Sequence, residues 1–221
     1  MSEVAEQKSK SSKALLELQD NALQDRLISE KVITAPSSAK GRLIQAAAAL
    51  FKDKGYERTT VRDLAAEVGI LSGSLFHHFK NKERILRAVM EEAILLNTER
   101  MKSALADAKS PEQKVLALIK CELASVLGET GAAMTVLVFE WRSLNEDSQQ
   151  YILGLRDIYE QMWLDALAEA KADGLVMIEP FILRRLLTGA LSWTVNWYES
   201  DGELDLDELA QNALTLAIKT A

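Results

Sequence analysis

The stretch TTVRDLAAEVGILSGSLFHHFKNKERIL, residues 59–86, decides the fold class of this 221-residue chain. A helix beginning at Val61 is followed by a turn at Gly69, and Ser72 can cap a second, short helix that ends near Phe79. An earlier helix is predicted from Ser37 or Ser38 to a C-terminal cap at Gly55, which makes three helices within about 45 residues, and Asn81 then begins a further, long helix. Short helices joined by a glycine-containing turn indicate a helix-turn-helix, whose second helix enters the major groove of DNA.

The two histidines of the chain, His77 and His78, could instead indicate a metal or catalytic site. Adjacent helical residues point about 100° apart, whereas zinc-binding histidines on a helix are spaced i, i+4. The sequence holds no HExxH motif and a single cysteine, Cys121, so neither metal binding nor an intramolecular disulfide is expected. It also lacks the GxSxG motif of a serine hydrolase, so no catalytic residue is predicted.

The charge of the chain is unevenly distributed. The formal net charge is −7, but residues 37–90 carry ten Lys and Arg against five Asp and Glu, while residues 91–221 carry eleven against twenty-two. A small basic module is therefore joined to a larger acidic one, and local positive charge is what a nucleic-acid-binding surface needs.

The composition favours helix throughout, because only three prolines and ten glycines interrupt long segments rich in Ala, Leu and Glu. Further helices are expected near residues 111–127, 131–143, 147–172, 180–199 and 205–220, which predicts an all-α fold of about nine helices. The N-terminus has no apolar signal sequence and no run of about 18 apolar residues occurs, so we expect a cytoplasmic protein outside the membrane.

Three domains are predicted: an N-terminal extension (1–36), a helix-turn-helix domain (37–86, with the motif at about 60–79) and a larger helical domain (87–221). Leucines at positions 15, 16, 23 and 27 suit an amphipathic helix within the extension. The extension is interpreted as a partly flexible, frayed tail, with a helix docked on a neighbour as the alternative.

The segment AAAALFKDKGYERTTVRDLAAEVGILSGSLFHHFKNKERIL resembles the DNA-binding domain of TetR-family transcriptional regulators over residues 38–86. The resemblance implies that the recognition helix runs from Ser72 to Phe79 and that its first residues and His77 lie nearest the bases. His78 lies either near the backbone or packed at the helix end. The implied base-contacting residues are Ser72, Gly73, Ser74 and His77, and those nearer the backbone are Thr60, Arg62, Phe76, His78, Lys80 and Lys82.

Phe76 departs from the family pattern, which often has tyrosine there with its hydroxyl bonded to a phosphate. A phenyl ring cannot make that bond, so van der Waals contact or packing remains for it. Lys82 matches a position that is typically used to hold phosphate.

The acidic domain would bind an effector and form a homodimer, since one helix-turn-helix reads one half of a palindromic operator. Two segments, LVFEWRSLNEDSQQYILGLRDIYEQMWLDAL and GALSWTVNWYESDGELDLDELA, resemble a TetR subgroup that responds to acyl-CoA or other lipid-derived ligands. The alternatives are that the tryptophans belong to the core and that Glu140 and Arg142 form a surface charge pair. The candidate ligand residues are Glu140, Arg142, Arg156, Trp193, Asn196 and Trp197.

The sequence thus predicts a homodimeric, ligand-responsive repressor of the TetR type that binds double-stranded DNA and a small-molecule effector, with no cofactor, no metal and no enzymatic activity. The alternative is an all-α ligand carrier or enzyme that uses the helix-turn-helix for protein contacts. The absence of a catalytic constellation argues against that alternative.

Overall fold

The protein is described by a computed structural model over residues 20–219, and within that range the regular secondary structure is entirely helical. The all-α prediction is confirmed. Residues 20–29 are helical. The elements that follow are α2 (Ala39–Lys54), α3 (Val61–Glu67), α4 (Ser72–Leu75), α5 (Lys82–Asp107), α6 (Pro111–Leu127), α7 (Gly131–Phe139), η1 (Trp141–Ser143), α8 (Glu146–Ala172), α9 (Pro180–Trp193), η2 (Thr194–Asn196) and α10 (Leu206–Ala217).

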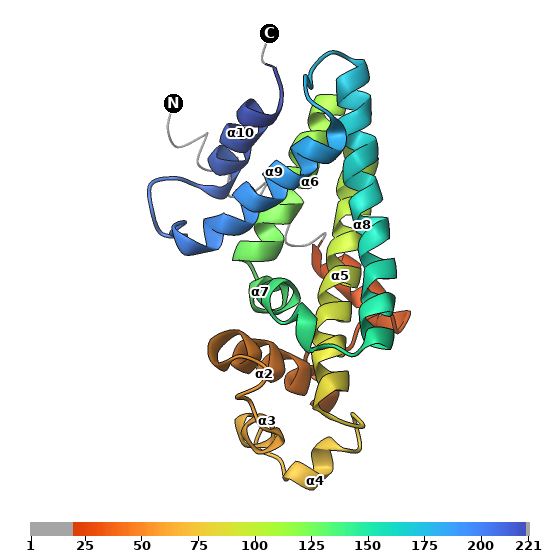
Figure 1. The fold of residues 1–221 in the computed structure, drawn as a ribbon, viewed down its shortest axis with the longest axis vertical. Coiled ribbons are helices and arrows are strands. Elements are labelled where there is room, and N and C mark those ends of the chain that lie inside the picture. The colour runs from red at the N-terminus through yellow and green to blue at the C-terminus, as the bar shows by residue number, and fades with distance from the viewer. Residues whose placement is uncertain (1–19, 220–221) are drawn as a thin grey trace.

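The helices form an elongated molecule with α2, α3 and α4 at one end (Figure 1). Helix α5 starts beside α4 and runs along the molecule next to α8, while α9 and α10 lie at the far end. Within residues 20–219 no single helix is long and apolar enough to span a bilayer. Helices α6 and α7 would satisfy that test only together, and the chain bends by 89° between them.

Polar side chains define where most helices start. Six N-cap side chains accept a hydrogen bond from a backbone N–H in the first turn, which satisfies donors that the helix leaves unpaired. They are Ser38, Thr60, Asn81, Ser110, Asn145 and Asp205.

Helix α4 begins differently from the sequence prediction. Ser72 is its first helical residue rather than its cap, and the preceding Leu71 provides no capping side chain. The α-helical part ends at Leu75, and i to i+3 hydrogen bonds continue the turn as far as His78. The recognition segment predicted from Ser72 to Phe79 is therefore one α-helical turn followed by tighter turns.

Two buried apolar clusters hold the molecule together. The first joins α2, α3 and α4 to the start of α5, and it also includes Met134, Val136 and Leu137 of α7. The second joins the end of α5 to α6, α8, α9 and α10 around the fully buried Trp163. Helix α7 thus packs with α2, α3 and α4 although it lies more than 40 residues beyond them in the sequence.

The helical residues 20–29 dock on α5, which corrects the interpretation of residues 20–36 as a frayed tail. Leu27 is 1% exposed and packs in a small cluster with Ile33 and Leu96. The Asp20 carboxylate accepts two hydrogen bonds of 2.7 Å from the Arg100 guanidinium. These residues agree with the alternative prediction, a helix docked on a neighbour. Residues 1–19, the earlier part of the predicted extension, lie outside the range that the structure describes.

The connection from this helix to α2 requires a glycine. The chain from Ala35 to Ser38 crosses directly over Gly41, in the first turn of α2. A Cβ atom at position 41 would lie 2.1 Å from the Ala35 carbonyl oxygen, which is backbone and cannot move aside alone.

Candidate nucleic-acid interface and cavity

The core fixes which side of the recognition segment faces outward. Leu75 is fully buried and Phe79 nearly so, and both belong to the cluster that includes Leu64 of α3. Phe76 is 53% exposed, so of the two roles left for its ring, van der Waals contact agrees with the structure and packing in the core does not. Burial of Leu75 and Phe79 turns Phe76 and His77 to the outside.

The predicted DNA-contacting residues are brought together at the end of the molecule formed by α3, α4 and the start of α5. Thr60 caps α3 in a capping box with Asp63: each side chain bonds the backbone N–H of the other residue. Ser72 and Ser74 are half-buried, and the others except Lys82 are exposed on this surface. The exposed residues are Thr60, Arg62, Gly73, Phe76, His77, His78 and Lys80.

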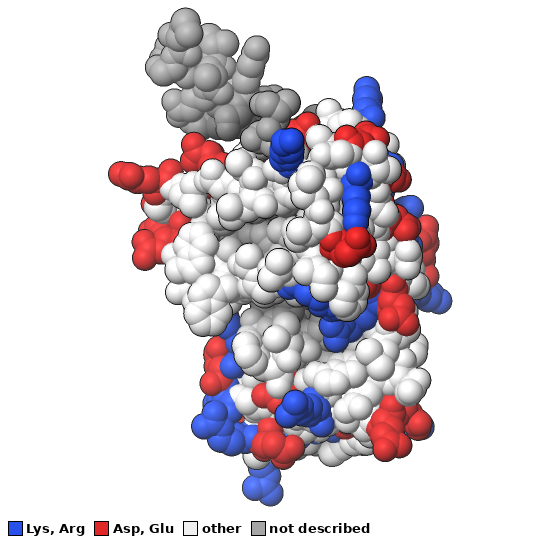
Figure 2. All heavy atoms as spheres, turned by 45° about the horizontal axis from the view of Figure 1, so that its top comes forward, with Lys and Arg blue, Asp and Glu red and all other residues white. Residues whose placement is uncertain are grey.

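Basic and acidic side chains are mixed at the end of the molecule that carries these helices, and a broad part of the rest of the visible face has few charges (Figure 2). The basic excess of residues 37–90 is therefore a local feature of an otherwise acidic chain. Contact between these residues and DNA stays a prediction at the level of each side chain.

Lys82 has a structural role that the sequence did not indicate. Its Nζ donates to the carbonyl oxygens of Tyr56 at 2.8 Å and Thr59 at 2.9 Å, and it lies 4.0 Å from the centre of the Tyr56 ring. These contacts join α5 to the turn between α2 and α3. An ammonium has three N–H donors, so one remains for a phosphate.

The same turn is also held by Glu140, at the end of α7. Its Oε1 accepts a hydrogen bond of 3.0 Å from the Tyr56 backbone N–H, and its Oε2 accepts one of 3.2 Å from Ser143. The Tyr56 ring packs edge-on against Phe51. Burial and the nearby carboxylates, including that of Glu140, raise the pKa of Tyr56 to about 12.

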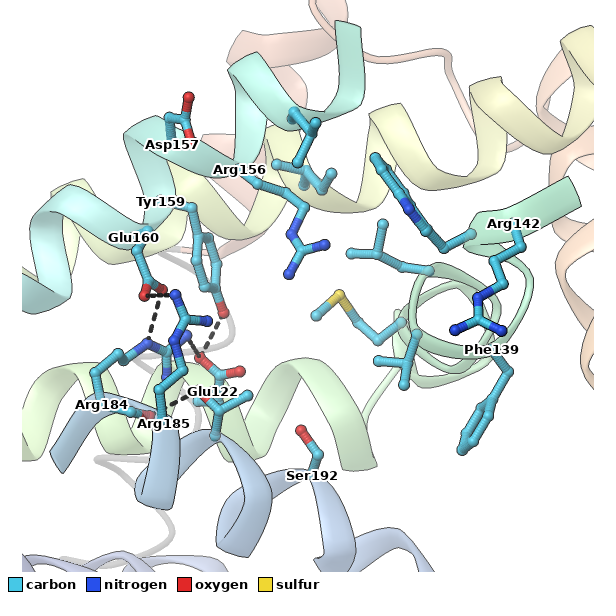
Figure 3. Close-up of a pocket in the computed structure, with 17 residues that line it drawn as sticks. Glu122, Phe139, Arg142, Arg156, Asp157, Tyr159, Glu160, Arg184, Arg185 and Ser192 are labelled. Carbon is cyan, nitrogen blue, oxygen red and sulfur yellow. Dashed lines mark hydrogen bonds and ion pairs between the residues drawn. The ribbon is translucent and has the colours of Figure 1, made fainter. Parts of the chain in front are cut away.

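A cavity of about 700 Å³ opens in the larger domain between α6, α7, α8 and α9 (Figure 3). This volume suits a small organic ligand. Apolar side chains supply much of its wall, and several charged groups line it as well. The lining residues are Ile94, Glu122, Met134, Leu137, Val138, Phe139, Trp141, Arg142, Leu153, Arg156, Asp157, Tyr159, Glu160, Arg184, Arg185, Thr188 and Ser192.

One end of the cavity holds a buried network of paired charges. Arg184 is 3% exposed, and its guanidinium donates to Glu160 at 3.1 Å and to Glu122 at 3.4 Å. The Tyr159 hydroxyl donates to Glu122 at 2.6 Å, and burial beside that carboxylate raises the pKa of Tyr159 well above its usual value. Arg185 lies 2.9 Å from Glu160, so two carboxylates face two guanidinium groups.

The other cationic groups of the cavity are unpaired within residues 20–219. Arg156 projects from α8 toward the middle of the cavity and lies 5.8 Å from the Trp141 ring centre, and Arg142 lies near the α7 end (Figure 3). Both guanidinium groups are exposed and neither has a carboxylate partner in that range. They give this part of the cavity a positive charge.

The structure places the six predicted ligand residues in three groups. Arg142 and Arg156 line the cavity, and Glu140 bonds to the α2–α3 turn instead. Trp193, Asn196 and Trp197 are exposed outside the cavity lining. Of the tryptophans offered as core residues, Trp163 is fully buried.

Sequence reasoning missed the buried network of Glu122, Tyr159, Glu160 and Arg184. The pair of arginines in PFILRRLLTGALSW was the available indication, because a charged residue in an apolar helix needs a partner when it is buried. Residues 20–219 contain no group of three or more His, Cys, Asp or Glu side chains close enough to hold a metal ion.

Comparisons with known proteins agree with this architecture. Residues 43–89 match the family model of bacterial regulatory proteins of the tetR family, and residues 108–221 match that of the tetracyclin repressor-like C-terminal domain. The HTH-type transcriptional repressor KstR2 of Mycolicibacterium smegmatis is 31% identical over 186 residues, covering 83% of this chain and 90% of that protein.

Two solved structures extend the likeness to three dimensions. The ketosteroid transcriptional regulator KstR2 of Mycobacterium tuberculosis has a TM-score of 0.75 at 25% identity, covering 86% of this chain and 100% of that one. A structure described as superantigen pfit has a TM-score of 0.79 at 52% identity, covering 91% of this chain and 100% of that one. Because family models match both parts of the chain, and a repressor is similar over most of its length, this chain belongs to the TetR family of DNA-binding transcriptional regulators.

Proposed function

We propose that this regulator is a ligand-responsive repressor whose effector is an amphiphilic anion, such as an acyl-CoA or another lipid-derived acid. The observation that carries the proposal is the cavity of about 700 Å³, in which apolar walls meet the unpaired Arg142 and Arg156. Guanidinium groups bind carboxylates and phosphates through paired hydrogen bonds. The apolar walls would receive the hydrocarbon part of the same ligand.

The relatives support repression and a lipid-derived effector. KstR2 of Mycolicibacterium smegmatis is named a repressor, and its counterpart of known structure is described as a ketosteroid regulator. Effector binding would lower operator affinity, and by linkage operator DNA would lower effector affinity by the same factor. The proposed site of action is the bacterial cytoplasm.

The proposed assembly is a homodimer formed through α9 and α10. Ile182, Leu186 and Trp193 lie on one face of α9, at positions i, i+4 and i+11, and all three are exposed. Phe181 is exposed on the same helix, Trp197 is exposed beyond its end, and Leu216 is exposed on α10. Exposed large apolar side chains that share one face of a helix indicate an interface. A two-fold pair would present two recognition segments to a palindromic operator.

The effector class is tested by thermal unfolding and isothermal titration with octanoyl-CoA, palmitoyl-CoA, oleate and free CoA. At 100 times the dissociation constant, a ligand adds about 2.7 kcal/mol to the free energy of unfolding. Acyl-CoA should stabilise the wild type, and the double variant Arg142→Gln/Arg156→Gln should lose most of that response. Arg62→Gln, in the DNA-binding helices, is the matched control and should keep it.

No response to any acyl-CoA or fatty acid would reject the effector class while leaving the DNA-binding assignment intact. The operator can be obtained by selecting bound sequences from a random DNA pool. We expect a palindrome that is bound more weakly as salt rises.

A further inference from the structure

The segment from Gly131 to Ser143, which comprises α7 and η1, contacts two parts of the molecule. Phe139, Trp141 and Arg142 line the cavity. Glu140 lies between them in the chain but is bonded to the DNA-binding half, through the Tyr56 backbone N–H. One short piece of backbone therefore forms both a wall of the cavity and a contact with the turn that precedes α3.

The turn is built to receive the Glu140 carboxylate. Gly55 ends α2 with a φ of +82°, a conformation that favours glycine. A Cβ atom there would lie 3.3 Å from Glu140 Oε1, so the glycine also leaves room for the carboxylate. The positive φ of Gly55 ends the helix. The open space beside Gly55 admits the Glu140 carboxylate, which accepts the hydrogen bond from the next backbone N–H, that of Tyr56.

A movement of this turn would be transmitted to the recognition segment through only a few residues. Thr59 is fully buried, and its hydroxyl donates to the Gly55 carbonyl oxygen at 2.9 Å. Thr60 then caps α3, and buried Leu64 of α3 belongs to the same cluster as Leu75 of α4. Because α3 is only seven residues long, its direction depends on how its first turn is held.

We propose that Glu140 is the positioning residue that couples the cavity to the helix-turn-helix. An occupant of the cavity displaces Trp141 and Arg142, and Glu140 moves with them because it is their covalent neighbour. The bond to Tyr56 is then lost or shifted, the turn moves relative to Lys82, and operator affinity falls. This inference rests on the proposed function only in that a ligand occupies the cavity; the chemical class of the ligand does not enter it.

The contact itself is tested without ligand or DNA, by hydrogen exchange of the Tyr56 amide in the full chain. A hydrogen bond to a charged acceptor protects an amide, so Glu140→Ala should raise the exchange rate at Tyr56 by about tenfold or more. Glu140→Gln keeps an acceptor oxygen and should restore most of the protection. Ser143→Ala, which removes only the other partner of Glu140, is the matched control. Unchanged exchange in Glu140→Ala would overturn the proposal.

The coupling is tested with a covalent occupant, so that the identity of the effector does not matter. Ser192 points into the cavity from α9 (Figure 3), and Ser192→Cys labelled with N-phenylmaleimide fills the space next to it. Burial raises the pKa of the Cys121 thiol to about 12, which directs the reagent to the introduced thiol. Operator affinity is then compared before and after labelling, with and without Glu140→Ala.

We expect labelling to weaken operator binding about tenfold with Glu140 present, within the usual range of allosteric coupling, and less than about twofold in Glu140→Ala. Equal losses in both backgrounds, or no loss in either, would overturn the proposal. Loss of all operator binding in a folded Glu140→Ala protein, restored by Glu140→Gln, would also support Glu140 as a positioning residue. If acyl-CoA fails to bind while the label acts through Glu140, the proposed effector class fails and this inference stands.

Discussion

Phe76 is an exposed aromatic residue at the end of the recognition segment, where related regulators often have tyrosine. Phe76→Tyr adds a hydroxyl on the surface that is predicted to face DNA. A new hydrogen bond to a phosphate contributes about 1 kcal/mol, so operator and non-operator DNA should both bind about fivefold more tightly. Fluorescence anisotropy with both DNAs measures this. Phe139→Tyr, also exposed but at the cavity, should leave DNA affinity unchanged; a change in base preference would contradict a phosphate contact at position 76.

Lys80 and Lys82 are both predicted to lie near the DNA backbone, but within residues 20–219 only the second of them, Lys82, bonds to backbone carbonyl oxygens. Lys82→Ala should therefore lower the free energy of unfolding by about 2 kcal/mol as well as weaken binding to all DNA. Lys80→Ala should weaken DNA binding and change stability by less than about 0.5 kcal/mol. Urea denaturation separates the two variants, and equal stability of both would show that the carbonyl contacts of Lys82 contribute nothing.

For single residues, the sequence indicated which side chains are exposed better than it indicated which groups they contact. The resemblance to TetR-type domains implied that Thr60, His77 and Lys80 lie on the surface, and the structure has all three exposed. It left packing open for Phe76, because a phenylalanine beside Leu75 and Phe79 fits an apolar pattern. The partners of Lys82 lie 23 and 26 residues away in the sequence, and no local rule indicates them.

At the scale of the element, the helical residues 20–29 contribute to the fold through one fully buried side chain. Leu27→Ala leaves a cavity against Ile33 and Leu96 and should lower the free energy of unfolding by about 3 kcal/mol. Asp25→Ala, exposed on the same helix, should cost less than about 0.5 kcal/mol. Urea denaturation measures both, and a neutral Leu27→Ala would mean that this helix is not docked in solution.

The interpretation of this segment as a tail failed for a physical reason. An amphipathic pattern shows that one side of a helix is apolar, but not what covers that side. The covering residues, Leu96 on α5 with Glu99 and Arg100 beside it, are themselves ordinary positions on a long helix. By contrast, α6 was predicted with its observed bounds because Ser110, Pro111 and Gly128 mark both ends.

At the scale of the whole molecule, the exposed apolar side of α9 predicts the oligomeric state. Leu186 is 62% exposed, and Leu186→Asp places a charge in the centre of the proposed interface. Sedimentation equilibrium should show a dimer for the wild type and a monomer for the variant, with a large loss of operator affinity. Leu71→Asp introduces the same charge at a residue that is 80% exposed beside α4, and it should remain dimeric. A dimeric Leu186→Asp protein would place the interface elsewhere.

The cavity was only partly predictable from the sequence. Arg142 and Arg156 were named because their segment resembles an acyl-CoA-responsive subgroup, but the cavity exists where four helices fail to fill the space between them, and that depends on their angles. Trp193 and Trp197 were also named as ligand residues, and the structure exposes both, Trp193 at the end of α9 and Trp197 directly after η2. The order of the helices could be predicted from the sequence, whereas the shape of the cavity between them could be determined only from the structure.

The crossing of the chain over Gly41 has a consequence for mutational scanning of this regulator. A side chain at that position would meet the Ala35 carbonyl oxygen, so a substitution would separate the docked N-terminal helix from α2. In a saturation library screened for repression, position 41 should be as intolerant as a base-contacting residue, although it contacts no DNA in the proposed complex. Scores at position 41 would need to be compared with protein abundance before they are interpreted as loss of operator recognition.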